Sequence, residues 1–117
     1  MALILPLMLV ASIAVTAVGL LGFLGKLPRN AFAGIRTPYT WKSDENWYAV
    51  HREGGPFIIL GGVAAISCGL AFTPFAIAGK ISSGPSAAIA IAMSVVLGFS
   101  VLVGWLYGTS KAKGREG

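Results

Sequence analysis

The side chains that could do chemistry are concentrated in one segment, residues 26–55. This segment holds 8 of the 13 charged residues, the single histidine His51, two of the three tryptophans and two of the three tyrosines. The guanidinium groups of Arg29 and Arg36 could each hold a phosphate or a carboxylate through paired hydrogen bonds. His51 could accept a proton near neutral pH. The chemistry available is therefore anion binding and proton exchange.

Catalysis and metal binding have little support in the sequence. One histidine without a second ligand does not make a zinc site, so we expect His51 to hydrogen-bond to Thr37, Thr40 or a loop carbonyl. Cys68 is the single cysteine, which excludes an intramolecular disulfide and a cysteine zinc cluster. No Ser-His-carboxylate or Cys-His arrangement and no Gly-rich phosphate loop is evident. We therefore predict a protein that is not an enzyme and has no cofactor.

The rest of the chain is far more apolar than a soluble domain. Of the 117 residues, 56% are hydrophobic and 11% are charged, whereas globular proteins have about 25% charged residues. Three uncharged stretches cover residues 1–25, 54–79 and 81–110. Each exceeds the ~20 residues that a helix needs to cross a bilayer. The sequence predicts a single integral, all-α membrane domain over residues 1–117, with transmembrane helices near residues 3–24, 57–78 and 86–108.

The distribution of positive charge predicts how the chain is oriented. With three spans, segment 26–55 and the C-terminal tail lie on one side and carry eight lysines and arginines, against Lys80 alone on the other. The positive-inside rule then predicts a cytoplasmic segment and tail and an external N-terminus. We expect the bilayer, including anionic headgroups, as a partner. Nucleic acid is not expected, because acidic residues are mixed with these cations and no recognition motif accompanies them.

The second half of segment 26–55 is typical of a short amphipathic helix at the membrane surface. Ser43 is a good N-cap, acidic residues follow it, and Gly54 suits the end of the helix. Trp47 and His51 fall on one semi-apolar face with Val50 and Gly54. Before this helix we expect an extended loop, in which Gly34 supplies a positive φ.

Small residues recur every four positions in the apolar stretches. Such spacing lets two helix backbones approach closely, either within the chain or between copies in an oligomer. Pro74 should kink or end the second span. The predicted helix-packing residues are Gly61, Ala65, Gly69, Gly104 and Gly108.

The motifs of the segment also resemble a known family. They run in the order Pro28-Arg29-Asn30, Gly34 through Thr40, Ser43-Asp44-Glu45, Trp47 and His51-Arg52. This order is similar to the signature of the SdpI family of multi-spanning bacterial membrane proteins, of which the chain would be a short, three-span member. The best-known member is the immunity protein against a secreted toxin that acts on sibling cells.

The resemblance implies a non-catalytic immunity or toxin-resistance protein of the bacterial cell membrane, which binds a partner, a toxin or a lipid at the loop. A small accessory or assembly subunit of a larger membrane complex is the alternative. We expect Arg36 to hold an anionic group, and Trp47 and His51 to close the loop from the helix. The predicted site consists of Arg29, Asn30, Gly34, Arg36, Thr37, Pro38, Ser43, Trp47 and His51.

Overall fold

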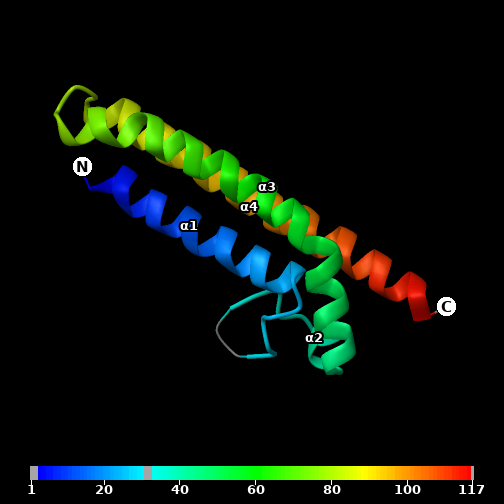
Figure 1. Ribbon diagram of the computed structural model, residues 1–117. Coiled ribbons are helices and arrows are strands. Elements are labelled where there is room, and N and C mark those ends of the chain that lie inside the picture. Colours follow the sequence, from blue (N-terminus) through cyan, green and yellow to red (C-terminus); the bar gives the residue numbers. More distant parts are fainter. Residues whose placement is uncertain (1–2, 31–32, 117) are drawn as a thin grey trace.

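The protein is a bundle of three long helices with a folded loop at one end (Figure 1). The computed structural model describes residues 3–30 and 33–116, and the side chains of residues 115 and 116 are not described. The described residues contain helices and no strand, which confirms the predicted all-helical membrane fold. The helices are α1 (Ile4–Phe23), α2 (Pro38–Trp41), α3 (Asp44–Ile77) and α4 (Ser83–Glu116).

Three of these helices are long and apolar enough to cross a membrane, namely α1, α3 and α4. The 20 residues of α1 correspond to about 30 Å, the thickness of the hydrocarbon core. The N-terminus and the turn between α3 and α4 lie at one end of the bundle, and the loop and the C-terminus lie at the other (Figure 1). The loop and the C-terminal end of α4 therefore lie at the same end of the bundle, as a three-span chain requires.

Helix α3 lies between the other two and meets each of them through glycines. On the side of α4, an added Cβ at Gly54 would collide with the backbone of Gly104, and one at Gly61 with the side chain of Ser100. Gly108 of α4 likewise approaches the backbone of α3. These glycines allow the two backbones to approach more closely than side chains would permit.

The neighbouring glycines of α3 face α1 instead. A Cβ at Gly55 would lie 2.8 Å from the carbonyl oxygen of Gly19, and one at Gly62 would collide with Thr16. Two Gly-Gly pairs seven residues apart thus each direct one glycine to α4 and the next to α1. This arrangement places α3 at the centre of the bundle.

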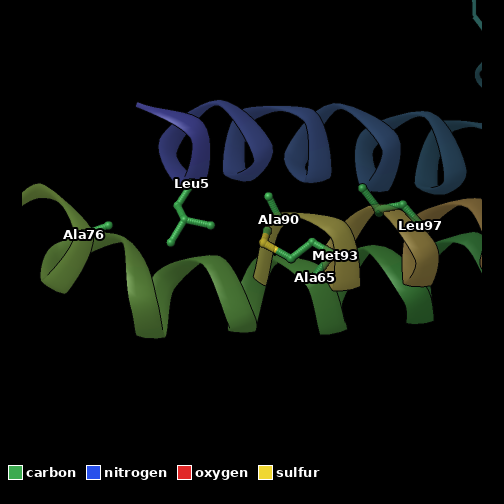
Figure 2. Packing of buried hydrophobic residues seen from close by; sticks show 6 residues of the cluster. All are labelled: Leu5, Ala65, Ala76, Ala90, Met93 and Leu97. Atoms are coloured by element: carbon green, nitrogen blue, oxygen red, sulfur yellow. The ribbon is translucent and has the colours of Figure 1, made fainter. Parts of the chain in front are cut away.

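A cluster of aliphatic side chains fills the bundle at the end away from the loop (Figure 2). Leu5 is fully buried and reaches from α1 toward the other two helices, and Met93 of α4 is almost fully buried. A second cluster, formed by Ile35, Val50, Ile58 and Ala112, joins the loop to α3 and α4. The side chains that face outward in the apolar stretches are themselves hydrophobic, as contact with lipid requires.

The structure corrects two helix boundaries that the sequence predicted. The surface helix does not end at Gly54, because α3 runs unbroken from Asp44 through the second span to Ile77. Pro56 lies inside α3 and leaves one helical carbonyl without its usual N–H partner, which is a common cause of a bend such as the one in Figure 1. Helix α3 ends at Ile77, three residues after Pro74 and one residue before the predicted end of the second span. Helix α4, which forms the third span, continues through the predicted tail to Glu116.

Glycines end α1 and α3 in the same way. Gly25 (φ 72°) follows the last residues of α1, and Gly79 (φ 73°) follows those of α3. In each case the next N–H, from Lys26 or Lys80, bonds back to a carbonyl five residues earlier. This Schellman motif satisfies carbonyls that the helix end would leave unpaired.

Candidate functional site

Trp47 fastens the start of the loop to α3. Its side chain is fully buried, and its indole Nε1–H donates a hydrogen bond of 2.9 Å to the carbonyl of Leu27. The ring also lies against His51, with the two ring centres 4.3 Å apart. A residue on the first turns of α3 thus holds the segment that leaves α1.

His51 fastens the middle of the loop. Its Nε2 accepts a hydrogen bond of 2.8 Å from the backbone N–H of Ile35, and its Nδ1 lies 2.7 Å from the carbonyl oxygen of Trp47. Because Nε2 accepts, Nδ1 carries the proton and donates to that carbonyl. His51 is therefore paired as expected for a buried polar group, but its loop partner is a backbone amide and not Thr37, Thr40 or a loop carbonyl.

Burial favours the neutral form of this histidine. His51 precedes the uncharged part of α3, which begins at Gly54, and it lies outside the membrane-spanning segment. Desolvation lowers the pKa of His51 below its ordinary value of 6.5, and the hydrogen bond to Trp47 opposes the shift. A protonated ring would direct Nε2–H at the N–H of Ile35. The bond to the loop therefore requires the neutral imidazole.

Two glycines make room for His51 against the loop and α1. Gly34 has φ 101°, as predicted for a glycine with positive φ, and an added Cβ there would lie 2.6 Å from Nε2 of His51. Gly22 of α1 approaches from the other side, where a Cβ would lie 2.9 Å from that of His51. We call Gly34, Trp47 and His51 the loop clamp.

The part of the loop between Gly34 and α3 contains the short helix α2, where the sequence predicts an extended path. The Thr37 hydroxyl accepts from the N–H of Thr40, the Thr40 hydroxyl accepts from the N–H of Thr37, and Pro38 occupies the first turn. This capping box stabilises even a four-residue helix. Thr37 and Pro38 thus shape the loop, and Thr40 is fully buried.

Ser43 begins α3 as the sequence predicts. Its hydroxyl accepts a hydrogen bond of 3.1 Å from the N–H of Asn46, and the acidic residues Asp44 and Glu45 occupy the first turn. The Asn46 side chain donates to the carbonyl of Tyr39, 3.0 Å away. The first turn of α3 therefore also holds α2 in place.

Arg29 lies on the outer side of the loop. Its Nε is 3.2 Å from a carboxylate oxygen of Asp44, and its Nη1 donates to the carbonyl of Trp41. Asn30 stays within its own turn, donating to the carbonyl of Pro28 and accepting from the N–H of Ala33. Both side chains stabilise the fold of the loop, although the pair of Arg29 with Asp44 is too exposed to contribute more than about 1 kcal/mol.

Arg36 is exposed and directly follows Ile35, whose N–H the clamp holds. Beneath this part of the loop lies an apolar crevice of about 250 Å³ between α1 and α4. Its lining includes Val15 and Val18 of α1, Gly34 and Ile35 of the loop, and Val101 of α4. The loop thus combines a cationic outer surface with an apolar inner one.

The structure brings together Gly34, Trp47 and His51, whereas Thr37, Pro38 and Ser43 act nearby as helix caps. Sequence reasoning missed the backbone groups that the clamp holds, and it missed Asn46. The close spacing of Gly19, Gly22 and Gly25 at the end of α1 favours close helix contact, and Gly19 and Gly22 do lie against α3. Backbone hydrogen-bond partners leave no such signal in residue types.

The predicted helix-packing residues lie inside the bundle. Gly61, Gly104 and Gly108 lie in the contact between α3 and α4, and Gly69 contacts Leu9 and Met93. These small residues join helices of one chain. The predicted residue Ala65 belongs to the aliphatic cluster that Figure 2 shows.

With this geometry established, comparison with known proteins identifies the family. The family model described as the SdpI/YfhL protein family matches residues 26–108, which are 83 of the 117 residues. The chain belongs to the SdpI family. The match starts at the loop and continues through both helices that hold it. No curated protein matches this SdpI-family chain in sequence, and no solved structure matches it in fold.

Family membership and the three apolar helices together describe a multi-pass membrane protein. The family is not known as one of enzymes. Within residues 3–30 and 33–116, no three histidine, cysteine, aspartate or glutamate side chains lie close enough together to hold a metal ion.

Proposed function

We propose that this SdpI-family protein protects the bacterial cell membrane against a membrane-acting toxin by binding a partner at the loop, without catalysis. The observation that carries the proposal is the loop clamp. Two buried side chains of α3 fix the backbone of a loop that would otherwise be free to move. A fixed loop loses little conformational entropy when it binds, and this favours recognition.

The surface that the clamp fixes has suitable chemistry for such a partner. Arg36 is exposed and directly follows Ile35, which lines the apolar crevice, so a toxin segment with an acidic or carboxylate group and an apolar side would meet complementary groups. Arg29 lies in an earlier part of the loop, none of whose described residues is among those that line the crevice, and we expect it to contribute less. The proposed orientation places this surface on the cytoplasmic side.

The alternative of an accessory subunit has less support. It rested on small-residue stripes as docking faces for other proteins, and Gly61, Gly104 and Gly108 are used between α3 and α4 of the same chain. A subunit of a larger complex would therefore need a different surface.

The proposal is tested by survival of cells. Bacteria that lack their own immunity protein would express this chain and be challenged with the secreted toxin that the best-known family member resists. We expect survival to rise with the wild-type chain, and to fall back to the empty-vector level with Arg36→Ala at equal membrane abundance. Arg29→Ala serves as a matched control and should retain most protection. The proposal would be contradicted if cells that express the wild-type chain survived no better than empty-vector cells, or if Arg36→Ala gave full protection.

A further inference from the structure

A second polar surface lies where the C-terminal end of α4 passes α2. A cavity of about 430 Å³ opens there, lined by Pro38, Tyr39, Lys42 and Lys113. The Nζ of Lys113 lies 5.2 Å from the centre of the Tyr39 ring, a cation–π geometry that holds the lysine against the loop. Two lysines from distant parts of the sequence thus line one concave surface, the two-lysine pocket.

We propose that the two-lysine pocket binds the phosphate group of an anionic phospholipid. No acidic side chain is among the four that line it, so a phosphate would meet positive charge without a competing carboxylate. The nearby carboxylate of Asp44 is engaged with Arg29 at 3.2 Å. Lysine is a common phosphate ligand because its ammonium acts as a compact positive charge with three donors.

The depth of the pocket indicates that the phosphate belongs to a lipid. Lys113 is five residues beyond residue 108, where the predicted third span ends. At about 1.5 Å per residue it lies roughly 7–8 Å beyond the end of that span, and the headgroup region is about 5–8 Å thick on each side. The ammonium groups are therefore at the level of lipid phosphates. The predicted orientation also directs them to the cytoplasmic leaflet, which is rich in anionic lipid.

A neighbouring cavity of similar size shows what distinguishes this pocket. It is also about 430 Å³, and it holds Lys111, whose Nζ lies 5.7 Å from the centre of the Tyr107 ring. The Glu53 carboxylate, however, shares that cavity and would repel an anion. The two cavities have the same lysine–tyrosine pairing at the same helix end but differ in net charge, so Lys111 provides a matched control.

The test measures lipid binding by the full-length chain in mild detergent, by native mass spectrometry with added phosphatidylglycerol or phosphatidylcholine. We expect the wild-type protein to prefer phosphatidylglycerol. An ammonium group in direct contact with the lipid phosphate contributes about fivefold to the affinity, and Lys111, which shares its cavity with Glu53, is not expected to make that contact. Lys42→Gln combined with Lys113→Gln should thus weaken phosphatidylglycerol binding about thirtyfold and leave phosphatidylcholine binding unchanged, whereas Lys111→Gln should change either by less than twofold.

Four results would overturn the proposal. The double variant could bind phosphatidylglycerol like the wild type, or Lys111→Gln could weaken binding as much, which would indicate diffuse surface attraction. Millimolar glycerol phosphate could also displace the lipid, which would make soluble phosphate the ligand. Circular dichroism checks the fold of the variants. If the double variant is unfolded, the wild-type protein still tests the proposal. Equal binding of phosphatidylglycerol and phosphatidylcholine by the wild type would refute it. The test uses no toxin, so its outcome is independent of the proposed immunity function.

Discussion

Replacing Gly34 by alanine should release the loop from α3 while leaving the three spans intact. The substitution adds a Cβ that would lie 2.6 Å from Nε2 of His51, the atom that accepts the N–H of Ile35. Leu27 and Trp47 line the same space at 3.2 Å, so the methyl group cannot turn away from the clamp. Either the His51–Ile35 hydrogen bond breaks or the loop backbone moves.

The magnitude follows from two separate costs. A non-glycine residue in the left-handed region costs about 1–2 kcal/mol, and both Gly34→Ala and Gly25→Ala incur a backbone cost of this kind. Gly25 also has a positive φ, but an added Cβ there would meet nothing within 4 Å. Separating the buried N–H of Ile35 from its acceptor costs a further ~1–3 kcal/mol. Only Gly34→Ala should incur that second cost.

Amide hydrogen exchange, followed by mass spectrometry on the protein in detergent, measures the difference. Local opening of the loop sets the exchange rate of the Ile35 amide. Relative to Gly25→Ala, Gly34→Ala should accelerate exchange in the peptide that contains Ile35 by roughly five- to 150-fold. Peptides from the central part of α3 should not change. Equal acceleration by the two variants would refute the reasoning, because it would show that backbone strain alone matters and that the contact with His51 does not.

Three further predictions concern the clamp, the bundle and the orientation. Because burial lowers the pKa of His51, the unfolded chain binds the proton more tightly than the folded one. Docking of the loop is therefore fully favourable above about pH 6.5 and weakens as the pH falls. Exchange of the Ile35 amide should accelerate below pH 6.5, and an exchange rate that does not depend on pH after correction for intrinsic exchange would contradict this. Gly54→Ala should destabilise the bundle by about 1–3 kcal/mol in thermal unfolding, because the added Cβ meets the backbone of α4. Gly98→Ala should not destabilise it, because an added Cβ at Gly98 meets open space. Equal melting temperatures of the two variants would contradict the close packing of α3 against α4. A cysteine at Ser43 in a Cys68→Ser background should react with an impermeant reagent from the cytoplasmic side only, and labelling from outside would overturn the orientation.

Much of the fold follows from residue types that act locally. The uncharged stretches predict three spans, because a charge in the hydrocarbon core is costly. Ser43 and Gly34 are each suited to one backbone role, an N-cap and a positive φ, and the structure assigns them those roles. The spacing of Trp47 and His51 predicts that they share a buried face, since positions four apart on a helix are neighbours.

The remaining features depend on contacts between distant segments. Gly54 favours the end of a helix in isolation, but in the bundle it lets α3 lie against the backbone of Gly104, and the packing overrides the local preference. The partner of His51 is the N–H of Ile35, a group that every residue other than proline carries and that no residue type identifies. Lys113 contacts the loop because α4 continues as a helix to Glu116, beyond residue 108 where the predicted third span ends.

The central claim is that the function depends on the loop that Trp47 and His51 hold in place. The most direct measurement is survival under toxin challenge of cells expressing Gly34→Ala, with Gly98→Ala as the control and both present in the membrane at wild-type abundance. We predict that Gly34→Ala loses protection and that Gly98→Ala keeps it. The account would be contradicted if Gly34→Ala gave full protection while fast exchange of its Ile35 amide showed that the loop had been released.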